Sequence, residues 1–187
     1  MKMSALIEFL DLLSENGIYT FTNGMIRSVF PGEPEENLKK TLSRAVSGRV
    51  IERVCRGVYL YARANSANAY KLESVAAALR GGKYSYISLE TALSEYGIIS
   101  QMTLGHLTVM TTGRSQKYAT PHGTIEFTHT SRPESEIVRN TFWQDRRPLR
   151  MANPETAFKD LRRVGRNVHM VDMETYYEVI CDRDSID

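Results

Sequence analysis

Three helical segments followed by a hairpin occupy the first third of the chain, and this order limits the possible folds more than any other feature of the sequence. Apolar residues recur every three or four positions over residues 4–16 and predict a helix that Gly17 ends. A second helix is expected over residues 22–30, stopped by Pro31, and a third over residues 35–47. The second helix is short, as a helix that only positions the next one can be.

Two β-rich runs follow the third helix and are predicted to pair as a hairpin. They cover residues 50–55 and 58–62, and the turn between them falls at Arg56 and Gly57. Three helices and a hairpin are the elements of a winged helix-turn-helix, in which the third helix lies in the major groove of DNA and the hairpin reaches a neighbouring phosphate or the minor groove. The sequence therefore predicts a winged helix-turn-helix DNA-binding domain over residues 1–64.

The charge of this predicted domain changes sign part-way along it. Residues 1–38 carry two basic and six acidic side chains, a net charge of −4, whereas residues 39–63 carry seven basic and one acidic, a net charge of +6. A basic face on one helix is usually only solvated surface. Here a basic third helix precedes a basic hairpin, both where DNA would lie, and the combination favours DNA binding.

The candidate DNA-binding residues follow from the expected helix and hairpin. The side of the third helix opposite its apolar residues carries side chains of the types that contact bases and phosphates. The tip of the hairpin carries two arginines that suit phosphates or the minor groove. The candidates are Asn37, Lys39, Lys40, Ser43, Arg44 and Ser47 on the helix, and Arg53 and Arg56 on the hairpin.

Residues 65–187 are predicted to form a second, α/β domain, linked to the first by the polar stretch 63–69. Helices are expected over residues 70–79, 88–96 and 172–180, with another starting at Asn153 and Pro154; strands are expected over residues 106–112 and 123–130, with a loop over residues 113–121. The predicted fold class is therefore α+β: a winged helix-turn-helix followed by a small α/β domain.

A search for catalytic or metal-binding patterns finds little. The four histidines and two cysteines lack the spacing of metal ligands, and no glycine-rich phosphate loop follows a predicted strand. Glu126 and Asp160 could form a carboxylate pair, but nothing in the sequence places them together. We therefore expect a protein that is not an enzyme and that needs no metal and no cofactor.

Two groups of arginines stand out in the second half of the chain. In the second group the cations suit the C-terminus of a helix, where they complement its dipole. The alternative is that these arginines contact nucleic acid or an acidic protein partner. They are Arg146, Arg147 and Arg150, and then Arg162, Arg163 and Arg166.

Composition points to a folded protein of the cytoplasm. Hydrophobic residues make up 42% of the chain and charged residues 25%, close to the averages of globular proteins. No apolar run approaches the ~20 residues that a membrane helix needs, and Glu8, Asp11 and Glu15 fall where a signal peptide would have its apolar core. We expect no membrane association.

Three stretches, in this order, resemble the AbiEi family, the antitoxins of type IV toxin-antitoxin systems. They are GRVIERVCRGVYLYA at residues 48–62, SYISLETALSEYGII at residues 85–99 and MANPETAFKDLRRVG at residues 151–165. The resemblance covers nearly the whole chain, and none of the stretches is a catalytic signature. Asn153 stands where the family has Ser as often, a conservative change for a helix cap.

This resemblance implies an N-terminal winged helix and a C-terminal antitoxin domain. It implies repression of the protein's own operon through inverted repeats in the promoter, and neutralisation of a cognate nucleotidyltransferase-like toxin without a stable complex. It also implies that three arginines lie at phosphates or the minor groove, and that five helix residues lie at the major groove: Lys39, Lys40, Ser43, Arg44 and Ser47. The three arginines are Arg49, Arg53 and Arg56.

Three other functions remain open at this point. The chain could be a repressor from a mobile element, with a sensor or oligomerisation module as its second domain. It could be a nuclease or another nucleic-acid enzyme that the winged helix only delivers to its substrate. It could be a protein-interaction module whose winged helix no longer binds DNA, although the change of charge after Leu38 argues against this.

Overall fold

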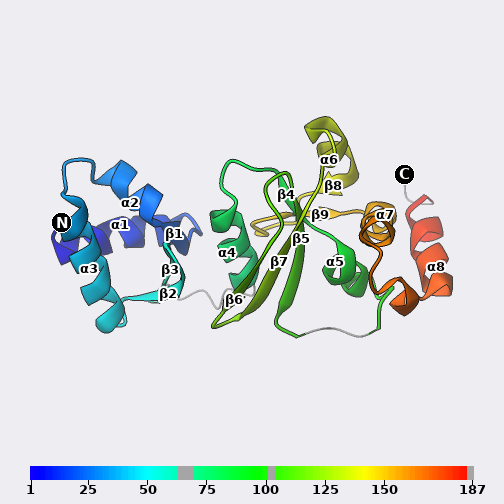
Figure 1. Ribbon diagram of the computed structural model, residues 1–187, viewed down its shortest axis with the longest axis horizontal. Coiled ribbons are helices and arrows are strands. Elements are labelled where there is room, and N and C mark those ends of the chain that lie inside the picture. The colour runs from blue at the N-terminus through cyan, green and yellow to red at the C-terminus, as the bar shows by residue number, and fades with distance from the viewer. Residues whose placement is uncertain (63–69, 101–103, 185–187) are drawn as a thin grey trace. The chain divides into compact units, whose positions relative to one another are not determined.

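The computed structural model describes residues 1–62, 70–100 and 104–184. It is a mixed α+β structure with eight α-helices in these ranges, one three-stranded antiparallel sheet and one six-stranded mixed sheet (Figure 1). The α+β class predicted from the sequence is confirmed. The chain divides into two compact units, Met1–Leu79 and Arg80–Asp187.

The three predicted helices and the hairpin of the first unit are present, together with one strand that the sequence did not indicate. That strand, β1, pairs with β3, so the three-stranded sheet has the order β1-β3-β2. The elements are α1 (Met3–Glu15), β1 (Thr20–Thr22), α2 (Asn23–Val29), α3 (Glu35–Ser47), β2 (Ile51–Cys55) and β3 (Val58–Tyr61).

β1 is not predicted by the sequence pattern because it has only three residues and pairs with only one strand, β3. Thr20 lies opposite Leu60, and Thr22 lies opposite Val58. The last residue of the strand also caps the next helix, because the Thr22 hydroxyl accepts a hydrogen bond from the backbone N–H of Met25 at 3.2 Å. The strand thus fixes where α2 begins.

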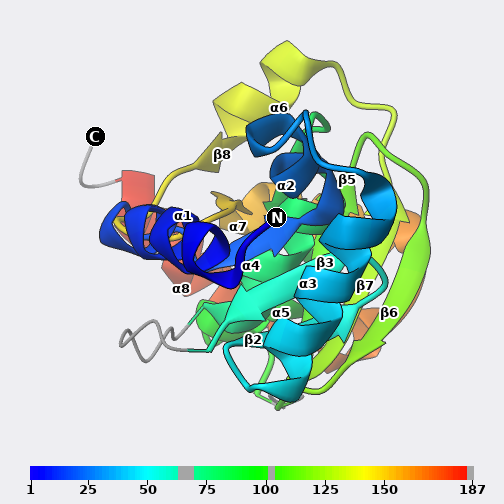
Figure 2. The ribbon, with the colours of Figure 1, turned by 90° about the vertical axis from the view of Figure 1, so that its left-hand side faces the viewer.

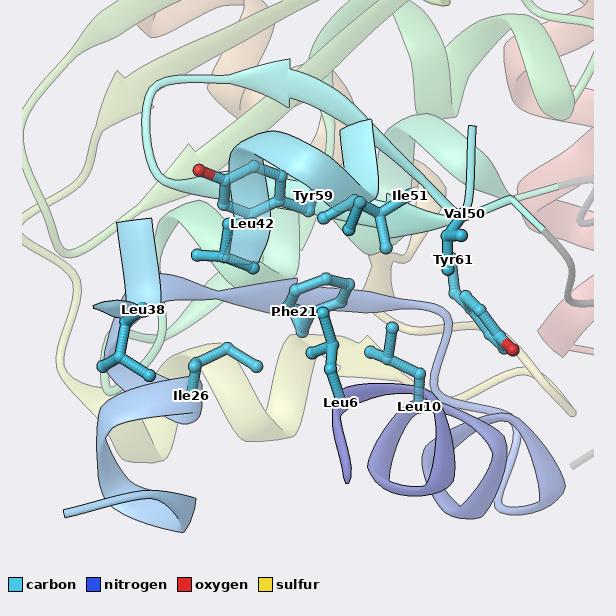
Figure 3. Close-up of a cluster of buried hydrophobic side chains, with 11 residues drawn as sticks. Leu6, Leu10, Phe21, Ile26, Leu38, Leu42, Val50, Ile51, Tyr59 and Tyr61 are labelled. Atoms are coloured by element: carbon cyan, nitrogen blue, oxygen red, sulfur yellow. The ribbon is translucent and has the colours of Figure 1, made fainter. Parts of the chain in front are cut away.

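One apolar core holds the three helices against this sheet (Figure 3). Leu6 and Leu10 of α1 and Leu42 of α3 are almost completely buried in it. Phe21 of β1 stacks on Tyr59 of β3 with ring centroids 5.5 Å apart, which joins the sheet to the same cluster. The exposed sides of α2 and α3 are therefore held in a defined orientation.

The helix α4 (Lys71–Leu79) belongs to the first unit. It contacts β1 and β3, and the division of the chain into compact units falls after Leu79. The sequence-based division at residues 64 and 65 placed this helix in the second domain. The spacing of its apolar residues predicts a helix, but it does not indicate which of the two cores the apolar side joins. Residues 63–69, predicted to be a linker, lie outside the described residues.

The second unit is built on the six-stranded sheet, with strand order β6-β7-β5-β4-β9-β8. α5, α7 and α8 lie to one side of this sheet (Figure 1). The elements are β4 (Ser85–Ile87), α5 (Leu89–Glu95), β5 (His106–Thr111), β6 (Gln116–Thr120), β7 (Gly123–His129), α6 (Glu134–Asn140), β8 (Thr141–Phe142), β9 (Arg150–Ala152), α7 (Pro154–Val164), a 3-10 turn at Val168–Met170 and α8 (Met173–Asp184).

The two predicted strands of this half are β5 and β7, which pair in parallel. The prediction of a loop over residues 113–121 was wrong, because residues 116–120 form the edge strand β6, antiparallel to β7. Side chains of an edge strand meet solvent, so polar residues at Gln116 and Lys117 gave no alternating apolar signal. The predicted start of a helix is confirmed: the Asn153 side chain accepts a hydrogen bond from the N–H of Thr156 at 2.9 Å.

Candidate nucleic-acid interface

A groove of about 530 Å³ lies between α2, α3 and the β2–β3 turn. Its apolar lining is buried or largely buried, whereas its charged lining is exposed. Four cations and one carboxylate give the lining a net charge of +3. The lining residues are Asn23, Ile26, Arg27, Glu35, Leu38, Lys39, Leu42, Ser43, Val46, Arg53, Arg56, Gly57 and Tyr59. We call it the α3–turn groove.

The hairpin forms one wall of this groove because its turn is fixed to α2. The backbone N–H of Asn23 donates a hydrogen bond to the carbonyl oxygen of Gly57 at 3.0 Å. Gly57 has φ +78°, a left-handed conformation that suits glycine in a tight turn. A register shift between Arg53 and Cys55 precedes the turn. The hydrogen bond to Asn23 therefore holds the turn of the hairpin against the start of α2.

The polar side of α3 is divided into two strips. Lys39 and Ser43 are four residues apart and line the groove. A second strip, spaced by three, four and three residues, is exposed and does not line it. Figure 2 shows α3 beside the hairpin. The residues of the second strip, which we call the outer strip, are Asn37, Lys40, Arg44 and Ser47.

The nine predicted DNA-binding residues are thus all exposed, but the structure brings only some of them together. The groove gathers Lys39 and Ser43 with Arg53 and Arg56 of the hairpin. The outer strip stands apart from the groove. Arg49 follows the C-terminus of α3 with φ 54° and does not line the groove either.

Arg27 and Tyr59 bring polar groups to the groove although neither was among the sequence candidates. Arg27 is in the last turn of α2, in a stretch whose net charge is negative, so no local pattern singled it out. Tyr59 could be an aromatic contact or a core residue by its sequence, and closure of the core was the favoured interpretation. Its ring does close the core, but its hydroxyl has no hydrogen-bond partner among the described residues, and Figure 3 shows it pointing out of the apolar cluster. Only the packing of α2 against the hairpin could reveal both.

One carboxylate, Glu35, is paired with two of the groove cations. Its Oε1 lies 2.6 Å from the Arg27 guanidinium and 2.9 Å from Lys39 Nζ. The hydrogen bond from Lys39 and then the charge of Arg27 hold the pKa of Glu35 below its ordinary value, so this carboxylate is ionised at neutral pH. Two of the four groove cations are therefore paired with one carboxylate within the protein.

The other basic candidates have no such partner. Within residues 1–62, 70–100 and 104–184, five of them form no ion pair and no side-chain hydrogen bond. An exposed guanidinium or ammonium group without a carboxylate is available to a phosphate. These five are Lys40, Arg44, Arg49, Arg53 and Arg56.

Several arginines of the second unit have a different role, because the fold uses them. Arg147 is 7% exposed and donates hydrogen bonds to both carboxylate oxygens of Glu95, at 2.6 and 2.7 Å. Arg150 donates to the Thr141 hydroxyl at 2.6 Å. A guanidinium held in this way is not free for a partner. These two candidates stabilise the second unit.

Arg166 likewise joins two elements of the second unit. It donates to Glu90 of α5 at 2.9 Å and is also paired with Glu126 of β7. The remaining candidates are more exposed: Arg146 lies 3.6 Å from Asp145, and Arg162 lies over the Phe158 ring. Arg163 lies 3.9 Å from the buried Asp160. The six arginines therefore do not form one binding surface.

Asp160 is the centre of a buried polar cluster. Its carboxylate is fully buried and accepts hydrogen bonds from the Tyr86 hydroxyl at 3.0 Å, the Ser88 hydroxyl at 2.9 Å and Arg132 at 2.9 Å. Burial and then the charge of Asp160 raise the pKa of Tyr86. Among the residues that the structure describes, Asp160 and Glu126 share no hydrogen-bond or ion-pair partner, so the two carboxylates do not act as a pair.

No group of three or more His, Cys, Asp or Glu side chains in the described ranges is placed to hold a metal ion. No helix in the same part of the chain is long and apolar enough to cross a membrane. Compared with known proteins, the chain matches no family model, no curated protein and no solved structure.

Proposed function

We propose that the first unit is a winged helix-turn-helix that binds double-stranded DNA, and that the protein represses its own operon. The observation that carries this proposal is the α3–turn groove, whose lining has a net charge of +3 beside an outer strip of polar and basic residues on the same helix. The element order α1-β1-α2-α3-β2-β3 is compatible with a winged helix and supports the proposal.

The two strips of α3 suit two kinds of DNA contact. In winged-helix complexes the third helix enters the major groove, and the hairpin contacts the adjacent backbone. A sugar-phosphate strand presents apolar deoxyribose carbons and anionic oxygens, and the groove lining includes the apolar Leu42 and Val46 together with the cations of Arg53 and Arg56. We assign the groove to the phosphates. The outer strip is then assigned to base edges.

A gel-shift titration of the full chain tests the proposal. Its own upstream DNA is compared with a scrambled duplex at two salt concentrations. A repressor binds the upstream DNA selectively, and its affinity falls as salt rises because phosphate contacts release counterions. Equal binding to both duplexes, or binding to neither, would exclude autoregulation and favour a protein partner.

We further propose that the second unit is the antitoxin part of a type IV toxin-antitoxin system. The support is the resemblance to the AbiEi family, together with the contacts between its second and third stretches. Those stretches contribute β4 and β9, which pair in parallel, and α5 and α7, which pack together. The Ser88 hydroxyl donates to Asp160 across them. The second and third stretches thus meet in one buried cluster.

Co-expression tests the antitoxin proposal. The protein is produced together with the product of a neighbouring nucleotidyltransferase gene, and growth is recorded. An antitoxin restores growth, and a variant with both Arg53→Ala and Arg56→Ala restores it too if the second unit alone neutralises the toxin. If no such neighbouring gene exists, the mobile-element repressor becomes the better explanation. A metal-dependent nuclease activity that one carboxylate substitution abolishes would instead establish an enzyme.

A further inference from the structure

The α3–turn groove contains one residue that opposes the proposed function. Glu35 is the only carboxylate in its described lining, and an anion at this position repels an entering phosphate. It is also the residue that holds Arg27 and Lys39, at 2.6 and 2.9 Å. A groove devoted to phosphate binding would leave these two cations free, so the presence of Glu35 needs an explanation.

We propose that Glu35 competes with DNA phosphate for the side chains of Arg27 and Lys39, and thereby weakens the binding of DNA to the α3–turn groove. This inference rests on the proposed DNA-binding function and adds a regulatory element to the same site. In the free protein Glu35 is paired with two of the four groove cations and offsets one of their positive charges. When a phosphate enters, the cations exchange one anion for another, and the carboxylate is left beside the phosphate.

The strength of these ion pairs suits such an exchange. The side chains of Arg27, Glu35 and Lys39 are 53 to 70% exposed, and exposed pairs contribute little to stability. The pairs therefore do not block the groove permanently. They lower the gain from each phosphate contact, and the freed carboxylate attracts a cation from solution. Fewer salt cations are then released into solution when DNA binds, so the salt dependence of the affinity is reduced as well.

The decisive variant is Glu35→Gln, compared with Glu8→Gln. Both substitutions remove one negative charge from the first unit, but Glu8 is exposed on α1 and does not line the groove. Binding of the full chain to a random-sequence duplex is measured by fluorescence anisotropy over a range of salt concentrations. We expect Glu35→Gln to bind about 3- to 10-fold more tightly at low salt and to have a salt slope steeper by about 1.

A double-mutant cycle tests the pairing itself. Arg27→Ala is made in the wild type and in the Glu35→Gln background. If Glu35 holds Arg27, removing the arginine costs less affinity in the wild type than in the Glu35→Gln protein, where the cation is free, by about 3-fold or more. Glu8, Arg27 and Glu35 are all exposed, so none of these substitutions should unfold the first unit. Thermal unfolding of each variant verifies this.

The outcomes separate this inference from the function on which it rests. If the wild type binds DNA and Glu35→Gln binds no more tightly than Glu8→Gln, the competition is refuted and the DNA-binding function stands. If neither the wild type nor Glu35→Gln binds any duplex, both proposals fall. Tighter binding by Glu35→Gln alone, with the non-additive effect of Arg27→Ala, supports the competition.

Discussion

The backbone N–H of Asn23 donates a hydrogen bond to the carbonyl oxygen of Gly57 at 3.0 Å, and this bond joins the start of α2 to the β2–β3 turn. It places Arg56, which lies in the turn, in the same groove as Arg27 of α2. The charge of the groove therefore comes from side chains that are far apart in the sequence. Its shape depends on the conformation of one turn.

Gly57→Ala should disturb this turn. Gly57 has φ +78°, which strains any residue with a Cβ, and the added methyl would lie 3.4 Å from Nδ2 of Asn23. We expect a loss of about 1–2 kcal/mol in the free energy of unfolding and weaker DNA binding. Gly32→Ala is the matched control, because a Cβ there meets nothing within 4 Å. Unchanged DNA affinity in the Gly57 variant would separate the turn from DNA binding.

Arg56→Ala tests the assignment of the groove to phosphates. A phosphate contact does not depend on sequence, so the variant should bind the upstream duplex and a scrambled duplex more weakly by the same factor. Its salt slope should be smaller by about 1. Anisotropy titrations at several salt concentrations measure both quantities. Lys83→Ala, which removes an exposed cation of the second unit, is the control. A loss confined to one duplex would place Arg56 at a base instead.

Arg44→Ala tests the outer strip of α3 and should behave differently. Arg44 is exposed and does not line the groove. If its guanidinium contacts a guanine edge, operator binding weakens by about 1–3 kcal/mol, whereas binding to a random duplex changes little. The same titrations provide the measurement. Equal weakening on both duplexes would assign Arg44 to the backbone, and no change would remove it from the interface.

Some of this structure could be predicted from residue patterns, and the rest depends on contacts between distant segments. The helix α3 was predicted over residues 35–47, its observed range, because its apolar spacing and Gly48 are local signals. β1 and β6 were missed because each is stable only through a neighbouring strand. The exposed cations on α3 could be predicted in the same way. The position of Arg27 in the groove could not, since α2, α3 and the hairpin must pack together before the groove exists.

Asp160→Asn should destabilise the second unit strongly. The fully buried carboxylate accepts hydrogen bonds from Tyr86, Ser88 and Arg132, and an amide removes the buried charge that faces the arginine, which keeps only its more exposed partner Glu136. Breaking one side of a buried ion pair typically costs about 3–5 kcal/mol. Chemical denaturation of the full chain measures the change. Asp145→Asn, at an exposed carboxylate, should have almost no effect. Equal stability of both variants would show that the cluster does not hold the unit together.

Glu126 should make the second unit less stable in acid. Burial raises the pKa of this carboxyl, but hydrogen bonding from Arg166 and the charges of Arg166, His106 and Lys117 outweigh that effect, so its pKa in the folded protein is below 4.5. Folding then favours the ionised form. This contribution is complete above pH 4.5, the ordinary value, and is lost as the pH falls through the folded-state pKa.

The variant Glu126→Gln lacks this carboxylate and should show the effect directly. At neutral pH we expect it to be less stable than the wild type by about 1–2 kcal/mol. The loss is no larger because Arg166 keeps its hydrogen bonds to Glu90. The difference should shrink below pH 4.5, since the wild-type carboxyl becomes protonated there. Denaturant unfolding over this pH range measures both curves. Curves that stay parallel into acid would show that the ionised carboxylate does not contribute, and that the substitution acts only through packing.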